Sequence, residues 1–214
     1  AARLRADRIT ADLDGERLLG PLLAIVNPPL WEIGHVAWFH EYWCLRYRDG
    51  GEPAPSIIEN ADRLYDSAKV AHDSRWTLPL PTLQATRAYA AEVLELVLRR
   101  LEREAENRAL QYFVRLATLH EDMHAEAFHY TRQTLGYADP FAQQYNAATA
   151  VQTASTSGDA EFAGGHFMLG AVNDGRFVFD NEKWAHEVRV APFCMARTAV
   201  SNANVRKPQG ALED

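Results

Sequence analysis

Cysteine, positive charge and long apolar runs are all scarce in this sequence, and each shortage argues against a class of protein. The two cysteines, Cys44 and Cys194, lie far apart, which argues against a disulfide framework and favours a reducing, cytoplasmic compartment. The formal net charge is −7 and there is no basic cluster, so nucleic acid is not an expected partner. No apolar run approaches a membrane span and no secretory signal is evident, so no membrane association is expected. Nothing in the sequence indicates an oligomeric state.

Apolar residues recur with helical spacing from the start of the chain to Gly136. The spacing predicts helices at residues 3–19, 28–46, 83–104 and 107–136. Asn27, Thr82 and Asn107 are placed to cap the last three of these helices, and Gly136 is a stop signal. Residues 49–81 are rich in glycine and proline, which predicts a long functional loop or lid.

The second predicted helix is apolar on more than one face, which is typical of a helix at the centre of a bundle. His35 shares a helical stripe with Trp31 and Trp38, so its ring is expected to point inward. Gly34 beside it has no side chain and lets another group approach closely. His40 lies five residues further on and is expected to face elsewhere.

The character of the chain changes after residue 140. Residues 141–160 are dominated by Ala, Gln, Thr, Ser and Gly, which predicts a linker between a helical domain at 1–140 and a second domain at 161–214. Short β-like runs follow at residues 164–170, 176–180 and 186–190. A β domain that stops at residue 214 is too short to close its own core, so we expect a fragment or a chain with pieces missing.

His120 and His124 are four residues apart in one predicted helix, so their rings project from one face toward a single metal ion. With Glu121 they spell the His-Glu-x-x-His motif of zinc proteases, in which the glutamate is the general base. The motif also arises by coincidence on charged helices. Ala127 and Tyr130 stand where one protease class has glycine and the third histidine, so a protease is not the expected function.

His35 is the best third ligand, because it too is expected on an inward, apolar helix face. The alternative for His35 alone is a buried core histidine. Iron(II) bound by three imidazoles keeps open positions for a substrate and dioxygen, whereas zinc would suit hydrolysis, and spacing does not choose between them. Glu121 and Glu126 are candidate acceptors for the ring N–H groups of the ligands, or else solvated helix charges.

Three motifs, taken in order, resemble one enzyme family. They are NPPLWEIGHVAWF at residues 27–39, HEDMH at 120–124, and GGHF with FVFDNE at 164–167 and 177–182. Together they resemble the non-haem iron sulfoxide synthases of ergothioneine and ovothiol biosynthesis, and the resemblance extends to about Asn202. It implies an α+β fold, with an N-terminal DinB-like four-helix bundle followed by a formylglycine-generating-enzyme-like domain of C-type-lectin fold, here incomplete.

The resemblance also implies a reaction. Carried over to this sequence, the iron(II) ligands are His35, His120 and His124, and dioxygen is a co-substrate. The small-molecule substrate is hercynine, the trimethylated betaine of histidine, which gains a bond to sulfur or selenium at C2 of its imidazole ring. The family uses further catalytic residues from the later domain, so none is assigned in this chain.

Two departures from the family pattern concern the donor molecule. Met123 precedes the last histidine, where ergothioneine enzymes carry a glutamine that touches the substrate. Residues 65–79 keep one arginine, Arg75, of a loop that in the family holds the carboxylates of a cysteine-type donor. A donor with fewer carboxylates needs fewer fixed positive charges. This loop, together with residues 31–35, most resembles selenoneine synthases, and that resemblance implies a selenosugar as the donor. Met123 and Arg75 are the predicted substrate contacts.

Other hypotheses stay open beside the selenium one. An ergothioneine-type sulfoxide synthase would join a cysteine-type thiol to hercynine through a C–S bond. A DinB-like metal-dependent thiol transferase would use the three histidines without dioxygen. A non-catalytic binding protein would carry them without any reaction.

Overall fold

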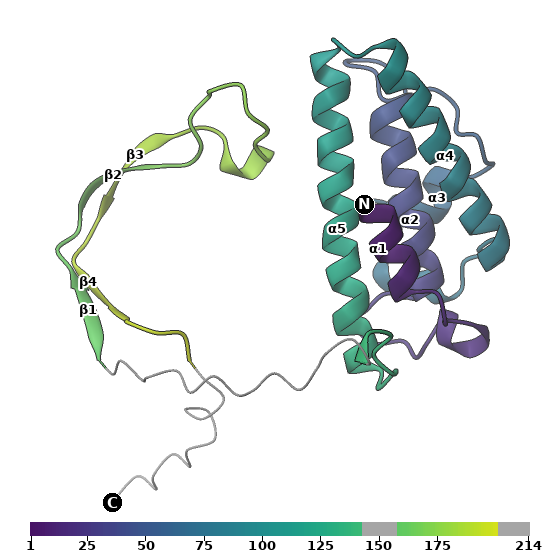
Figure 1. Cartoon of the computed structure of the whole chain (residues 1–214), viewed down its shortest axis with the longest axis horizontal. Helices are drawn as coiled ribbons and strands as arrows, with labels where there is room; N and C mark the ends of the chain where they lie inside the picture. Colours follow the sequence, from purple (N-terminus) through teal and green to yellow (C-terminus); the bar gives the residue numbers. More distant parts are fainter. Residues whose placement is uncertain (143–157, 201–214) are drawn as a thin grey trace, which may run out of the picture. The chain divides into compact units, whose positions relative to one another are not determined.

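The helical spacing of the sequence corresponds to a bundle of helices in the computed structural model, which describes residues 1–142 and 158–200 (Figure 1). The chain divides into two units, Ala1–Asn146 and Ala147–Asp214. The α-helices of the first unit are α1 (Ala2–Ile9), α2 (Pro29–Glu41), α3 (Ala61–Tyr65), α4 (Leu83–Arg103) and α5 (Arg108–Thr134). Most of the predicted linker, residues 143–157, lies outside the described residues.

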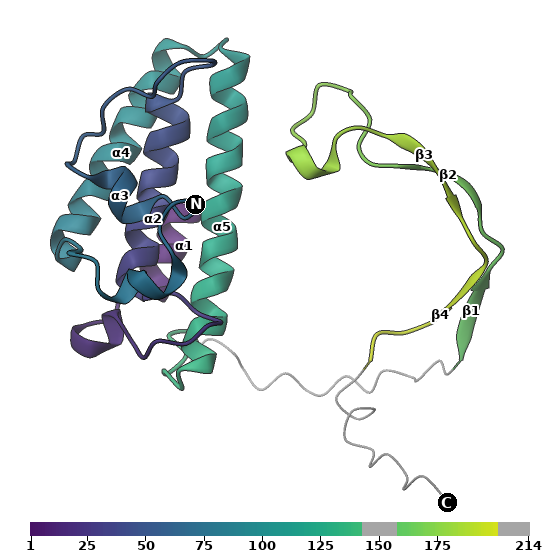
Figure 2. The ribbon, with the colours of Figure 1, turned by 180° about the vertical axis from the view of Figure 1, so that it is seen from behind.

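Helix α2 is the central element of the first unit, as its several apolar faces predicted. It packs against α3, α4 and α5, and α1 packs against α5 (Figure 2). Trp31 and Trp38 of α2 join Tyr65, Tyr89 and Val93 in the main apolar core. The interior of the bundle is therefore built around the helix that carries His35.

The stretch predicted as a long loop or lid is largely part of the bundle. It contains α3 and a short 3-10 helix, His72–Trp76, and it is fastened to α2 by hydrogen bonds. The indole of Trp31 donates to the carbonyl of Leu64 at 2.7 Å, and the indole of Trp38 donates to Asp62 Oδ1 at 2.7 Å. Because Tyr65 is completely buried, this part of the stretch acts as a wall of the core rather than as a lid.

Two of the three predicted helix caps are confirmed. Thr82 Oγ1 accepts a hydrogen bond from the amide of Ala85, and Asn107 Oδ1 accepts one from Leu110. The cap predicted at Asn27 is wrong, because the N-cap of α2 is Pro28 and has no side-chain cap. The Asn27 side chain instead accepts a hydrogen bond from Arg75, a residue distant in sequence that local pattern does not reveal.

The first predicted helix, 3–19, is wrong in its length. Helix α1 ends at Ile9, and a separate 3-10 turn, Gly15–Leu18, follows. Arg132 of α5 explains the break, since its guanidinium donates to the carbonyl of Ile9 at 3.0 Å and pairs with Asp12 at 2.9 Å. These contacts replace the hydrogen bonds that a continued helix would make.

The described part of the second unit is a small antiparallel sheet region. Its strands are β1 (Asp159–Phe162), β2 (Gly165–Leu169), β3 (His186–Val190) and β4 (Phe193–Ala196). Strand β1 pairs with β4, and β2 pairs with β3, so the inner pair is nested within the outer pair in sequence. The described chain is thus α+β, with helices first and strands second. None of the described helices has the length and hydrophobicity needed to cross a membrane.

The strands predicted at 164–170 and 186–190 are confirmed, but the one predicted at 176–180 is wrong. In the described structure that segment is not a strand and runs into a short 3-10 helix, Asp180–Glu182. Its apolar side chains pack locally instead: Val178 is buried and the rings of Phe177 and Phe179 meet edge to face. Strand β1 starts at Asp159, two residues before the predicted start of the second domain at residue 161.

Replacing Gly34 by alanine tests the packing of α2 against α3. The added Cβ would lie 2.2 Å from Cε1 of the buried Tyr65 ring. Overpacking of this kind costs about 1–3 kcal/mol, which exceeds the gain in helix propensity of about 1 kcal/mol. We expect a lower free energy of unfolding in urea for Gly34→Ala. Gly51→Ala, whose nearest contact would be 3.7 Å away, is the control. Equal losses in both variants would contradict this packing argument.

Candidate metal centre

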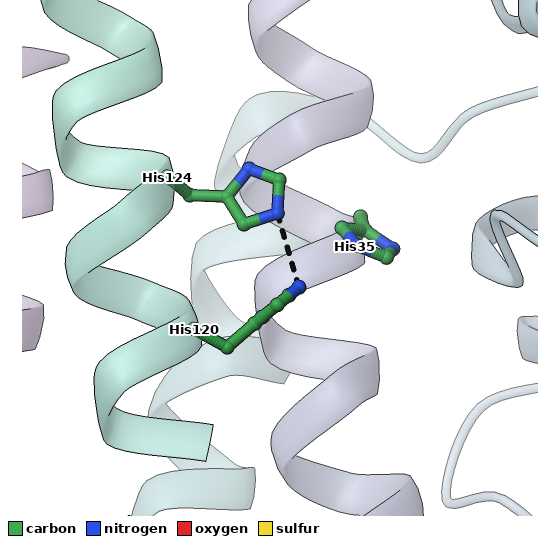
Figure 3. Close-up of side chains that lie close together, drawn as sticks. All are labelled: His35, His120 and His124. Carbon is green, nitrogen blue, oxygen red and sulfur yellow. Dashed lines mark hydrogen bonds between the residues drawn. The ribbon is translucent and has the colours of Figure 1, made fainter. Parts of the chain in front are cut away.

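Three histidine side chains from two helices converge between α2 and α5, as the sequence predicted (Figure 3). His35 comes from α2, and His120 and His124 come from α5; their ligand atoms all lie within 4.8 Å of one another. The Nε2 atoms of His120 and His124 are 3.1 Å apart. Two metal–nitrogen bonds of about 2.1 Å that meet near a right angle span roughly 3 Å, so this pair is spaced for one ion.

Two contacts with the core hold His35: a hydrogen bond at one ring nitrogen and stacking on its ring face. Its Nδ1 lies 2.8 Å from the carbonyl oxygen of Tyr65, and its ring stacks on Trp31 with 4.8 Å between centroids. Since a carbonyl can only accept, Nδ1 carries the hydrogen and Nε2 is left as the metal-binding nitrogen. Burial of Tyr65 against Gly34 thus helps to fix which nitrogen of His35 is presented.

His124 is held by a carboxylate that sequence reasoning missed. Its Nδ1 lies 2.5 Å from Oε1 of Glu32, a residue of α2 with an exposed fraction of 0%. The prediction that Glu121 or Glu126 would accept from a ligand ring is wrong for the described structure. Glu126 is exposed, and Glu121 faces away from the site. The available signal was the position of Glu32, three residues before His35, which places both on neighbouring parts of one helix face.

His120 is oriented by stacking rather than by an acceptor. The ring of Phe39 lies parallel to it, with 3.7 Å between centroids and 13° between planes. Its Nδ1 is buried, and within the described residues no hydrogen-bond partner reaches it. The three rings are therefore held by contacts of three kinds: a backbone carbonyl for His35, a carboxylate for His124 and an aromatic face for His120.

Burial keeps two of the three rings neutral. It lowers the pKa of His35 to about 3 and that of His120 to about 2, with the neighbouring His124 as the next cause in each case. A neutral imidazole has a lone pair to donate, whereas a protonated one does not. Both rings are thus in the state that a metal requires at neutral pH.

The glutamate of the His-Glu-x-x-His motif is not placed to act as a protease base. Glu121 has an exposed fraction of 3%; Arg3 Nε donates to its Oε1 at 2.5 Å, and His40 Nε2 lies 3.2 Å from its Oε2. Burial raises its pKa, but the hydrogen bonds from His40 and Arg3 outweigh this and lower it overall. Glu121 ties α1 and α2 to α5, and the expectation that His40 faces away from the site is confirmed.

The two predicted substrate contacts differ in how they are held. Arg75 lies over the ring of Trp31 at 4.0 Å and donates to Asn27 and to the carbonyl of Val70. Its Nε is buried, and among the described residues it has no partner. Met123 is 53% exposed on α5. A role of either residue in substrate binding stays a prediction.

Comparison with known proteins places this site in context. The family whose sequence pattern matches is described as the DinB superfamily, and the match covers residues 1–128. The chain is also 30% identical to proteins named hercynine oxygenase from Mycolicibacterium thermoresistibile over 208 residues, Mycolicibacterium smegmatis over 211 and Mycobacterium tuberculosis over 204. These matches cover 96%, 96% and 94% of this chain but 45%, 47% and 47% of the relatives. The chain therefore spans about half the length of these curated relatives.

The lowered pKa values predict how the metal-free protein responds to acid. The unfolded chain protonates its histidines near pH 6.5, while the folded protein resists protonation of His35 and His120, so acid favours unfolding. The stability that depends on neutral rings is fully present above about pH 6.5 and is lost as the pH falls toward about 3. We expect the urea concentration at the unfolding midpoint to decrease as the pH is lowered from about 7 to about 4. In His120→Gln this decrease should be less steep. Identical slopes in both proteins would contradict the assignment.

Proposed function

This chain belongs to the DinB superfamily, and from that premise we propose that it carries the metal centre of an iron(II)- and dioxygen-dependent enzyme acting on hercynine. The observation that supports the metal is the convergence of His35, His120 and His124. The names of the relatives support the substrate, since each is called hercynine oxygenase. In the proposed reaction the C2–H bond of the hercynine ring and the S–H bond of a thiol are replaced by a C–S bond. Dioxygen is the oxidant: one of its oxygen atoms ends on the sulfur as a sulfoxide, and the other leaves as water with the two displaced hydrogens.

The donor set fits iron(II). Imidazole nitrogen is a ligand for iron as well as for zinc, and three such ligands leave positions open on an octahedral ion. When bound, iron(II) would supply the one-electron and dioxygen chemistry that side chains lack. Zinc would suit the thiol-transferase alternative instead, so the identity of the metal separates these two functions.

Residues around the triad have distinct parts in this proposal. Trp31 and Trp38, with exposed fractions of 1% and 5%, form an inner wall that keeps water away from His35. Arg75, beside Trp31 and with its buried Nε–H unpartnered in the described structure, would hold a substrate carboxylate. Met123 would touch the substrate from the exposed side of α5.

We rank the sulfur donor above the selenosugar that the sequence departures favoured. The relatives are named for hercynine and not for selenium, and they match nearly the whole chain. The selenosugar remains the second candidate because a single arginine, Arg75, lies in the loop where the family holds a donor with several carboxylates. The ranking therefore follows the relatives, and the single arginine of this loop is the argument for the alternative donor.

The second unit enters the proposal as the start of a formylglycine-generating-enzyme-like domain. Its support is the resemblance of residues 164–167 and 177–182 to that domain, together with the nested antiparallel strands β1–β4 and β2–β3. We keep the domain ranges 1–140 and 161–214, joined by 141–160, as part of the same proposal.

Metal analysis together with oxygen uptake tests the function. The purified protein should bind iron(II), and hercynine with a thiol donor should stimulate oxygen consumption. His124→Ala removes one of three ligands and should abolish both. His129→Ala, which changes an exposed histidine of the same helix, should leave both unchanged. Zinc without oxygen uptake would instead support the thiol transferase, and absence of any metal would support a binding protein.

Product mass with competing donors tests the choice between sulfur and selenium. With hercynine, a cysteine-type thiol and a selenosugar supplied together, we expect the C–S adduct as the main product. Arg75→Leu should raise the KM for the thiol more than it changes kcat, because it removes a binding charge. Arg99→Leu, which removes an exposed arginine paired with Glu95, is the control. A predominant C–Se adduct would reverse the ranking.

A further inference from the structure

Glu32 is buried, but only one of its two carboxylate oxygens has a hydrogen-bond partner among the described residues. It is completely buried in the first turn of α2, and its Oε1 accepts from Nδ1 of His124 at 2.5 Å. Its Oε2 is also buried, and no hydrogen-bond partner among the described residues reaches it. Burying a carboxylate with an unpaired oxygen opposes folding, so stability does not explain why a glutamate stands here.

Glu41, near the other end of the same helix, shows how this fold treats a structural carboxylate. Its exposed fraction is 1%, close to that of Glu32. Its oxygens accept from Tyr89 Oη at 2.6 Å, from Ser56 Oγ at 2.7 Å and from the amide of Ile57 at 2.7 Å. Glu41 thus ties α4 and the chain after α2 together, whereas the one hydrogen bond that the described structure gives Glu32 goes to a ring of the triad.

Glu32 stands near the N-terminal end of α2, directly behind one ring of the metal centre. Glu32 lies in the first turn of α2, where the positive end of the helix dipole stabilises a negative charge. The carboxylate stands behind His124, on the side of the ring opposite to the Nε2 that approaches His120. A carboxylate in that place fixes the tautomer, limits rotation of the ring and increases the electron density that Nε2 donates.

We infer that Glu32 is a positioning residue of the metal centre, acting through His124. This inference rests on the metal-binding part of the proposed function and adds to it a residue of the motif at 27–39 to which the sequence analysis gave no role. Of the three ligands, His35 is backed by a neutral carbonyl and His120 by an aromatic ring, so the negative charge reaches the metal through His124. The anion offsets part of the charge of a divalent ion and strengthens its binding.

Glu32→Gln keeps the size of the side chain and removes its charge, and Glu41→Gln is the matched control. For Glu32→Gln we expect metal-free thermal stability that is unchanged or higher, and affinity for iron(II) weaker by about 10–100-fold. We also expect a shift of the visible bands of the cobalt(II)-substituted protein, which report the ligand field. For Glu41→Gln we expect lower metal-free stability, with the wild-type affinity and cobalt spectrum retained. Anaerobic competition with a chromophoric chelator measures the affinity.

Glu32→Met is the second variant, because it removes both charge and acceptor while retaining volume and helix propensity, and its loss of affinity should exceed that of Glu32→Gln. Wild-type affinity and cobalt spectrum in either folded variant would overturn the inference, as would a wild-type protein that binds neither metal. A wild-type protein that binds metal without oxygen uptake would instead overturn the proposed function. In that case weaker binding by Glu32→Gln would still support the positioning role.

Discussion

The packing of α2 against α5 is the contact on which the rest of the described site depends. It brings His35 to the pair His120 and His124 from the other side of the bundle core. The same helix α2 supplies Glu32 to one ligand and Phe39 to another, so one interface sets the place of all three rings. Because close-packed interiors resist small displacements, a site built across this interface is held in place before any ligand arrives.

The segment between α2 and α4 contributes to the site through its backbone carbonyl groups. Its backbone carbonyl at Tyr65 accepts from His35, and its neighbour Leu64 accepts from Trp31. Gly34 permits this approach, since a side chain at that position would occupy the space of the Tyr65 ring. A stretch whose sequence is rich in glycine and proline thus helps to position one ligand, His35.

Some of this was predictable from local pattern alone. The four-residue spacing of His120 and His124, the caps at Thr82 and Asn107 and the inward direction of His35 all follow from helix geometry, which acts over a few residues. The end of α1 and the partner of Asn27 were not predictable, because Arg132 and Arg75 reach them from distant parts of the chain. The acceptor behind His124 was missed because sequence proximity pointed to Glu121 or Glu126, whereas the acceptor Glu32 lies on another helix, close to His35 in sequence.

The sequence by itself determined which residues were able to bind a metal and on which helix faces they stood, since side-chain direction along a helix is a local property. Only the tertiary structure decided that Glu32 backs His124 while Glu121 pairs with Arg3 and His40. The physical reason is that a buried carboxylate takes whatever donor the packing of neighbouring helices brings within reach, and that packing is a property of the whole bundle.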